Sequence, residues 1–324
     1  MGLGRYVALR VAWAAAVSMI IVTIAFLLIS FSPNPEIQDA VRSASLQGEN
    51  PAEARERIKE LRGLDQPLHE RYLDFMQNVY TLEWGWSDSR NQPVEEALLE
   101  SVYYTAQYSI PWTILTVLIG PLVGLYSAAN MYSWKDHAAT GFAFAGWAMP
   151  NFFFAIILLL VFGIWLEWIP ITYNTDAAVF SLENARQLFF PVFVLVTGSI
   201  AATMRVARNE SAEFINADFM KTAKAKGVSP FRAYAYHVMR PTLVPLSTTL
   251  VGQLLAVFLG SSLLVEFVFS IPGLGRTTFD ALVAQDTNLV LGSVLIFTFI
   301  GVVGNLLEDL VFTVLDPRIS YDDR

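Results

Sequence analysis

Six stretches of this 324-residue sequence contain no Asp, Glu, Lys or Arg, and this pattern constrains the fold more than any other feature. A helix needs roughly 20 consecutive apolar residues to cross the hydrocarbon core of a bilayer at about 1.5 Å per residue. Each stretch reaches or nearly reaches that length. We therefore expect six transmembrane helices, at Val11 to Pro35, Ser101 to Trp134, Ala138 to Leu166, Gln187 to Met204, Pro241 to Val265 and Thr287 to Leu307.

The composition favours an all-α, polytopic membrane protein. Hydrophobic residues make up 54% of the chain and charged residues 15%, which is too apolar for a soluble fold of this size. The first stretch is longer than the apolar core of a signal peptide, and no small-residue cleavage site follows it, so we expect it to remain as a helix. The chain has no cysteine, which excludes disulfides, thiol catalysis and Cys-based metal sites.

The distribution of basic residues predicts the orientation, because Lys and Arg are enriched in short loops on the cytoplasmic side. Arg5 and Arg10 precede the first stretch, whereas the connections after the third and fifth stretches hold one each, Arg186 and Arg276. Between the fourth and fifth stretches lie seven: Arg205, Arg208, Lys221, Lys224, Lys226, Arg232 and Arg240. Both termini and the loop 209–240 are therefore predicted to be cytoplasmic.

This orientation predicts the organisation of the chain. Residues 1–32 form the cytoplasmic N-terminus and the first helix, and 33–100 form a helical extracytoplasmic segment. Residues 101–315 form the core with helices two to six, and 316–324 form a cytoplasmic tail. The outer segment holds seven basic and fourteen acidic residues, so nearly all of the net charge of −8 lies there; long loops translocate largely regardless of charge.

Turn and cap signals divide the outer segment into helices. Asn50 and Pro51 have the pattern of an N-cap and a first-turn proline, for a helix through Arg62 that stops at Gly63. Glu53 and Arg57 are spaced for an ion pair on it. A second helix from Pro67 would place on one face Leu68, Tyr72, Phe75, Met76 and Val79. We expect a turn at the membrane surface over Leu82 to Ser87, and a short helix that begins at Gln92 and Pro93.

The loop before the fifth stretch is amphipathic and basic, and it predicts two short helices about a glycine corner. Asn216 or Asp218 is suited to cap a first helix, which carries Phe219, Met220 and Ala223 on one side and Lys224 and Lys226 in its last turn. Gly227 fits a left-handed C′ position, with Val228 closing against Ala223. Ser229 and Pro230 begin the second helix, whose stripe is Phe231, Tyr234 and Val238.

Such a pair of helices is too short to be stable alone, so another surface must cover its apolar side. Two readings are equally consistent with the pattern by itself. The helices lie flat on an anionic membrane surface, or they dock on another protein.

Several motifs of this sequence resemble the membrane permeases of ATP-binding-cassette importers, in the branch for dipeptides, oligopeptides and nickel, and within it the first permease of the pair. Lys221-Thr222-Ala223 followed by Gly227 keeps the spacing of the family's cytoplasmic EAA loop, with Lys in place of Glu. Pro241 and Pro245 come later than the family pattern. Further similarities lie at Phe31-Ser32-Pro33, at Leu61 to Pro67 with Tyr72, at Trp168, Pro170 and Tyr173, at Glu266 to Arg276 and at Leu315 to Arg318. Glu83 to Ser87 departs from the family turn, since it holds Trp84 and Trp86.

The resemblance implies the six-helix fold of a type I importer permease and a set of partners. These are a homologous second permease, two cytoplasmic ATPases and an extracytoplasmic solute-binding protein; no nucleic acid is expected. The chain lacks the G-x-x-x-x-G-K-[ST] pattern that cradles ATP phosphates, so we expect no catalytic residues, cofactor or metal in this chain, with ATP and Mg²⁺ bound by the ATPases. By the resemblance, the ATPase-coupling loop comprises Phe219, Met220, Lys221, Thr222, Ala223, Lys224 and Gly227.

A second candidate site lies at the outer mouth. Glu266 stands close to Pro272, Gly273 and Gly275, whose backbone freedom suits a re-entrant gate. A plain turn is equally consistent with the pattern.

Other polar and proline residues carry weaker hypotheses. Glu308 and Asp309 near the inner end of the last stretch favour a packing or snorkelling role over contact with the solute. The three histidines are isolated, without metal-ligand spacing. Prolines within the second to fourth stretches are expected to kink their helices, at Pro111, Pro121, Pro150 and Pro191.

Two rival functions are weaker. An ion-coupled secondary transporter normally carries carboxylates near the middle of its spans, and an intramembrane enzyme needs a catalytic constellation; neither pattern is present. Within the family, the sequence leaves open whether the cargo is a peptide, a nickel complex or an oligosaccharide.

Overall fold

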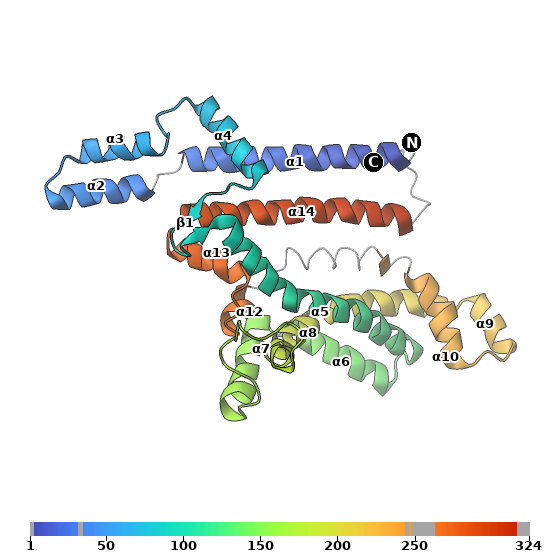
Figure 1. Ribbon diagram of the computed structural model, residues 1–324. Coiled ribbons are helices and arrows are strands. Elements are labelled where there is room, and N and C mark those ends of the chain that lie inside the picture. Colours follow the sequence, from blue (N-terminus) through green and yellow to red (C-terminus); the bar gives the residue numbers. More distant parts are fainter. Residues whose placement is uncertain (1–2, 32–34, 244–245, 248–262, 316–324) are drawn as a thin grey trace. The chain divides into compact units, whose positions relative to one another are not determined.

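The computed structural model describes residues 3–31, 35–243, 246–247 and 263–315. These residues are almost entirely helical, and the ribbon is shown in Figure 1. The chain divides into two compact units. One comprises Met1–Val7, Ser101–Arg276 and Gly304–Arg324, and the other comprises Ala8–Glu100 and Thr277–Val303; we describe each by itself and call them the core unit and the outer unit.

The core unit is built around two long helices. They are α5 (Val94–Ala129), of which residues 101–129 belong here, and α8 (Leu182–Ile215). α6 (Trp134–Ala148), α7 (Asn151–Leu158) and the π-helix η1 (Leu159–Trp165) connect them. The largest buried cluster of the unit includes Tyr108 on α5 and Val194 and Leu195 on α8.

Small residues let α5 approach α8 closely. A Cβ added at Gly120 would lie 2.7 Å from Cβ of Thr203, and one at Gly124 would lie 2.6 Å from both Cβ of Ala207 and the carbonyl oxygen of Met204. Helices in a bilayer gain little from hydrophobic burial against one another, and close contact at small residues replaces it. The Gly-x-x-x-Gly spacing of Gly120 and Gly124 therefore explains this packing, which we had not predicted.

The third apolar stretch forms two helices rather than one straight span. α6 and the α7–η1 helix are bent by 97° at a short break. Met149 and Pro150 adopt extended ψ angles of 125° and 127° there, because the proline ring disfavours helical geometry in the preceding residue. The predicted kink at Pro150 is thus a sharp bend, whereas α5 continues through Pro111 and Pro121 and α8 continues through Pro191.

Short elements complete the core unit. Downstream of α8 are α9 (Asp218–Ala225), α10 (Pro230–Arg232) and the π-helix η2 (Ala233–Val238). After the residues that are not described come α12 (Leu263–Val268) and α13 (Leu274–Val283), whose first turn belongs to this unit. In Figure 1, α9 and α10 lie at one end of α5 and α12 lies toward the other.

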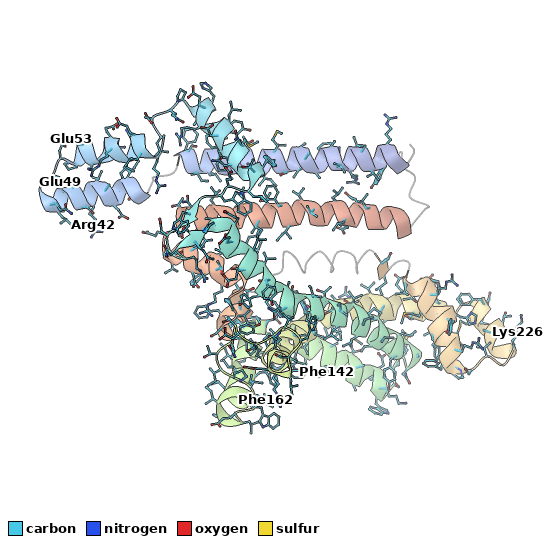
Figure 2. The ribbon with its side chains drawn as sticks, viewed as in Figure 1. Arg42, Glu49, Glu53, Phe142, Phe162 and Lys226 are labelled. Atoms are coloured by element: carbon cyan, nitrogen blue, oxygen red, sulfur yellow. The ribbon has the colours of Figure 1, made fainter. Side chains whose placement is uncertain are left out.

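The outer unit packs two membrane-length helices and a set of short ones. α1 (Leu3–Phe31) and α14 (Thr287–Leu315) meet at Val22 and Leu295, and α4 (Leu68–Thr81) adds Val79 to the same buried cluster. α2 (Pro35–Gln47) and α3 (Pro51–Leu61) form a helical hairpin, visible at the left of Figure 1. Figure 2 labels three exposed residues of this hairpin, namely Arg42, Glu49 and Glu53.

The predicted caps of the outer segment are confirmed in part. The Asn50 side chain accepts a hydrogen bond from the Ala52 N–H at 3.0 Å, Pro51 is the first helical residue, and Gly63 has a positive φ of 61°. Val79 is buried on the predicted face of α4. The polar partner of Glu53 is Asn50, at 3.0 Å, and not the expected Arg57. The helix α2 had no signal that we recognised.

The short helix that we expected to lead into the second span is present as the first turns of α5, but its expected start at Gln92 and Pro93 is wrong. These residues form strand β2 (Gln92–Pro93), which pairs antiparallel with β1 (Trp86–Ser87), and α5 begins only at Val94. The Val94 N–H donates to the Gly85 carbonyl at 3.0 Å, so the backbone polar groups of this turn are satisfied by a hairpin rather than by a helix.

The number of spans is established only in part. Four described helices are long and apolar enough to cross a membrane: α1, α5, α8 and α14. The bent α6–α7–η1 pair counts as a fifth if it is one broken span. The greater part of the predicted fifth span, 248–262, lies outside the described residues, and so does the end of the Leu315 to Arg318 motif. Six spans therefore stays a prediction.

Candidate functional site

The loop between α8 and the predicted fifth span forms a helical knob, which we define as residues 216–240. α9 ends as predicted, since Gly227 has a φ of 74° and the Val228 N–H donates to the Ala223 carbonyl at 3.2 Å. This six-to-one bond closes a Schellman turn at a residue where a side chain would be strained. Ser229 and Pro230 begin the second arm. The sequence therefore determined the corner of the knob.

The knob has its own core, so part of the apolar side that we expected a membrane or another protein to cover is buried within this chain. Met220 is 0% exposed and Ala223 is 8% exposed. Met220 packs with Ala233 and Val238 against Leu125 of α5 and Phe214 of α8. Met220 and Ala223 are thus buried where the knob attaches to the rest of this chain.

The second arm is wound as a π-helix, which changes its buried face. Ala233 and Val238, five residues apart, are both buried, whereas Phe231 is 80% exposed. The i to i+5 repeat of a π-helix places such residues above one another. The predicted stripe of Phe231, Tyr234 and Val238 assumed α-helical spacing and is wrong for Phe231.

The outward surface of the knob is aromatic and basic. Phe219, Phe231 and Tyr236 are exposed. Lys221 is exposed and pairs with Asp218 at 2.8 Å, and Lys226 lies at the tip in Figure 2. Thr222 donates to the Asp218 carbonyl. The Lys224 side chain lies outside the described residues.

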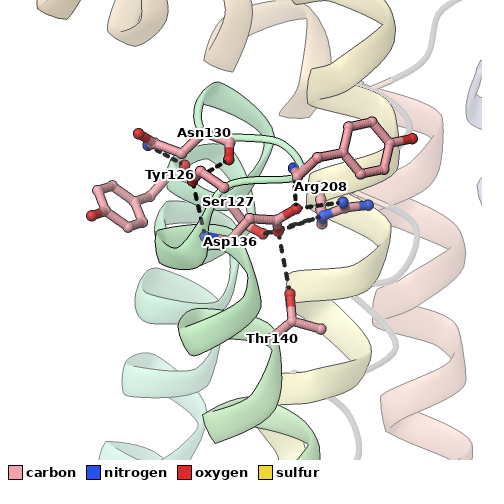
Figure 3. A network of polar contacts seen from close by, with 8 residues as sticks. Tyr126, Ser127, Asn130, Asp136, Thr140 and Arg208 are labelled. Atoms are coloured by element: carbon pink, nitrogen blue, oxygen red, sulfur yellow. Dashed lines mark hydrogen bonds and ion pairs between the residues drawn. The ribbon is translucent and has the colours of Figure 1, made fainter.

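A buried polar network joins the bundle directly beside the knob, and sequence reasoning missed it. Asp136, in the first turn of α6, is 2% exposed. Its carboxylate accepts from Arg208 Nε at 3.0 Å and from an Arg208 terminal nitrogen at 2.8 Å. It also accepts from the Ser127 hydroxyl, the Thr140 hydroxyl and the Tyr132 N–H. Figure 3 shows how these groups converge from α5, α6 and α8.

Arg208 contacts the Asp136 carboxylate with two nitrogen atoms, and this bidentate geometry strengthens the network. An Arg fork that meets a carboxylate with two nitrogens fixes geometry as well as charge. The signal in the sequence was the position of each residue: Asp136 lies two residues before a charge-free stretch, and Arg208 lies four residues after one. We had counted Arg208 only as a topology marker.

At the other end of α5, Glu266 holds the candidate gate segment 266–276, which we call the elbow. This residue is 0% exposed. Its carboxylate accepts from the Thr105 hydroxyl at 2.9 Å, from the Tyr108 hydroxyl at 2.7 Å and from the Arg276 N–H at 2.8 Å. Thr105 also accepts from the Leu274 N–H at 2.8 Å. Glu266 therefore ties the elbow to α5.

The glycine of the elbow is required by this contact. A Cβ at Gly273 would collide with the Glu266 carboxylate and would lie 2.7 Å from the Thr105 hydroxyl oxygen. Gly275 is also buried, and Pro272, which directly precedes Gly273, is half-buried. The structure thus brings Glu266, Gly273 and Gly275 together.

α5 connects the two polar sites. Thr105 and Ser127 lie about 33 Å apart along the helix at 1.5 Å per residue, which is close to the roughly 30 Å thickness of a bilayer's hydrocarbon core. Leu125, which touches the knob, is two residues from Ser127. A displacement of the knob therefore acts on the same helix that holds the elbow.

Two groups in connecting segments, Asp286 and Tyr173, have perturbed pKa values. Burial acts to raise the pKa of Asp286, but hydrogen bonds from the Ser87 hydroxyl at 2.6 Å, the Leu289 N–H and Ser89 together lower it below its usual value. Burial raises the pKa of Tyr173 to about 12, and its hydroxyl donates to Asn184 Oδ1 at 3.0 Å. Both residues fasten connecting segments and neither has a catalytic partner.

The described residues hold no candidate metal centre. No group of three or more His, Cys, Asp or Glu side chains gathers there with the spacing of a metal site.

The comparisons with known proteins cover nearly the whole chain. A putative peptide transport system permease of Brucella abortus is 32% identical over 97% of this chain and 98% of its own length. The oligopeptide transport system permease AppB of Bacillus subtilis is 34% identical over 82% of this chain and 85% of its own length. The di/tripeptide transport system permease DppB of Pseudomonas aeruginosa is 28% identical over 91% and 93%.

The family model described as the binding-protein-dependent transport system inner membrane component matches residues 120–321. That range includes α6 to α8, the knob, the Asp136–Arg208 network and the Glu266 elbow. It extends over more than half of the sequence. Together with the relatives, this match shows that the chain belongs to the family of binding-protein-dependent transport system inner membrane components, the permeases of ATP-binding-cassette importers.

Proposed function

We propose that this chain forms, with a second homologous permease, the membrane pathway of an ATP-driven importer of peptides. The observation that carries the proposal is the match along almost the entire chain to permeases that are named for peptide transport. We further propose two ATPases on the cytoplasmic side, which bind ATP and Mg²⁺, and a solute-binding protein outside. Both termini of this permease would be cytoplasmic in the cell membrane, in keeping with the distribution of Lys and Arg.

The knob is the part of this chain on which the ATPases dock and which their movement displaces. Its exposed aromatic residues Phe219 and Phe231 are of the kind that anchors an interface, and the charges of Lys221 and Lys226 orient the encounter with an acidic rim. Met220 transmits the force, since it packs on Leu125 and Phe214. The coupling role is thus divided between an outward face and an inward one.

The Asp136–Arg208 network carries the movement into the bundle, and the Glu266 elbow responds at the other end of α5. The elbow would act as the outer gate, because Glu266 links α12, α13 and α5 through hydrogen bonds. Such bonds can exchange partners during a movement, whereas tightly packed side chains would have to separate. In this scheme Gly273 permits the closed arrangement.

Uptake by the reconstituted complex tests the proposal. The permease is co-expressed with its partners, and uptake of a radiolabelled tripeptide is measured in proteoliposomes with ATP inside. Phe219→Asp and Phe231→Asp are expected to reduce uptake and co-purification of the ATPases by about tenfold or more, since each buries a charge at an aromatic anchor. Phe180→Asp changes a fully exposed phenylalanine away from the knob and should leave the ATPases bound.

Two results would contradict the proposal. ATPases that co-purify fully with both knob variants would show that the knob is not the docking element. Uptake that persists when the ATPase nucleotide site is disabled, driven by an ion gradient, would favour the secondary-transporter alternative.

A further inference from the structure

The core unit contains a cavity between α5, α6 and α8 that is open on one side. Its volume is about 240 Å³. Three residues of α5, one of α6 and three of α8 line it: Trp112, Thr113, Thr116, Trp147, Gly198, Ser199 and Ala202. Thr116 lies near the middle of the charge-free stretch 101–134, and Ser199 lies within the stretch 187–204, so the cavity is at the depth of the bilayer's hydrocarbon core.

One polar group in the cavity lacks a partner. The Thr116 hydroxyl oxygen is buried, the residue being 3% exposed, and it makes no hydrogen bond within the part of the chain that the structure describes. By contrast, the hydroxyl of Ser199 accepts from the Trp112 indole N–H at 3.2 Å. An unsatisfied hydroxyl costs on the order of 1–3 kcal/mol when it is buried, and lipid cannot supply a partner. A hydrogen-bonding occupant is therefore expected beside Thr116.

The size and the lining restrict that occupant. At about 30 Å³ each, roughly eight water molecules would fill the cavity, so it is larger than a single structural water requires. It is smaller than the roughly 300–1,000 Å³ of a pocket that encloses a whole small ligand. Among the described residues that line it there is no charged side chain, but there are two indoles and three hydroxyl side chains. These features suit one neutral, hydrogen-bonding part of a longer molecule.

We propose that this cavity is a contact site for the transported solute inside the membrane, where the Thr116 and Ser199 hydroxyls bond to backbone amides of a peptide and Trp112 and Trp147 flank it. The inference rests on the proposed function, because it takes peptides as the cargo. It adds a site that would bind part of a peptide of any amino-acid sequence. Every residue of a peptide offers a backbone amide, and the uncharged site would not select a charge on the peptide's side chains.

The opposite side of α8 supplies a matched control. Thr197 is equally buried, at 6% exposed, but its hydroxyl donates to the backbone carbonyls of Phe193 and Val194 at 2.9 and 3.0 Å. It lines a separate, mainly apolar cavity of about 460 Å³. Thr197→Val therefore removes the same hydroxyl at a similar depth without touching the proposed contact site.

The first measurement is transport of labelled trialanine by the complete reconstituted importer. Thr116→Val and Ser199→Ala are each expected to lower uptake at subsaturating trialanine by about threefold to tenfold, the effect of one lost hydrogen bond, while ATPase stimulation by the loaded binding protein is retained. Thr197→Val should transport at the wild-type rate. Equal rates in Thr116→Val, Ser199→Ala and wild type would overturn the proposal.

The second measurement uses the absence of cysteine in this chain. A single cysteine at Thr116 should react with a small water-soluble methanethiosulfonate, and trialanine with the binding protein and ATP should slow the reaction. Thr197→Cys, whose side chain lines the mainly apolar cavity, should react at the same rate whether or not trialanine is present. A Thr116 cysteine that stays unreactive, or that reacts only with a lipid-soluble maleimide, would show that a partner helix or lipid covers the cavity and would overturn the inference. If wild-type protein fails to transport trialanine at all, the proposed function fails instead.

Discussion

At the scale of single residues, the buried ion pair of Asp136 and Arg208 is the contact whose loss has the clearest physical cost. Removing one partner of a buried pair leaves a charge without compensation. We expect Asp136→Asn to destabilise the protein by about 2 kcal/mol, below the usual range for fully buried pairs, because the Arg208 side chain is still 23% exposed. Arg208→Lys should cost less, since it keeps the charge but loses the fork.

Thermal unfolding of the detergent-solubilised permease measures this difference. Glu56→Gln removes an exposed ion pair with Lys59 and serves as the control, for which we expect almost no shift in Tm. A Tm for Asp136→Asn as high as that of the control would contradict the assignment of the network as a stabilising element.

Asp286 gives a prediction about pH. Its pKa is lowered in the folded protein, so its hydrogen bonds contribute stability above the unfolded pKa of about 3.9, and this contribution is lost as the pH falls through the folded pKa. The Tm difference between wild type and Asp286→Asn should therefore be largest near neutral pH and shrink below about pH 4. A difference that grows on acidification would reverse the sign and contradict the pKa direction.

At the scale of elements, the contact of α5 with α8 depends on glycine. A side chain at Gly124 meets backbone atoms of α8, namely the Met204 carbonyl oxygen at 2.6 Å and the Arg208 nitrogen at 2.9 Å. Since backbone cannot rotate away, Gly124→Ala should force the helices apart at a cost of about 1–3 kcal/mol. Gly141→Ala on α6 meets open space and should be neutral or stabilising by up to about 1 kcal/mol.

Urea or thermal titration of the two alanine variants separates packing from helix propensity, because both changes add the same methyl group to a helix. Equal stability of the two variants would show that α5 and α8 do not pack as closely as the structure has them. The same comparison in the uptake assay tells whether their separation also uncouples the knob.

At the scale of the whole molecule, the membrane orientation follows from the basic residues and is open to a direct test. A cysteine at Asn50, which caps α3, should react with an impermeant maleimide added to intact cells or spheroplasts. A cysteine at Ser229, which begins the second arm of the knob, should react only after the membrane is permeabilised. The opposite labelling pattern would invert the orientation and move the knob away from the cytoplasmic ATPases.

Particular residues show why the sequence predicted some features and not others. The corner at Gly227 and the cap at Asn50 are local, because each depends on the backbone preferences of a few neighbouring residues. The 97° bend at Pro150 was recognised only as a kink, since a proline indicates a break but not its angle. The pairing of Gln92 and Pro93 with Trp86 and Ser87 was missed because both helix starts and hairpins use the same polar and proline residues.

The sequence by itself determined that the chain is a helical membrane protein with a basic helical corner before its predicted fifth span. The length of an apolar stretch and the residues of a turn both depend on neighbouring positions in the sequence. Tertiary structure alone decided that Met220 faces the bundle, that Asp136 meets Arg208 and that Glu266 meets Thr105 and Tyr108. The physical reason is distance along the chain. The hydrogen-bonded partners among these residues lie 72 to 161 residues apart in the sequence, and only the packing of whole helices brings them together.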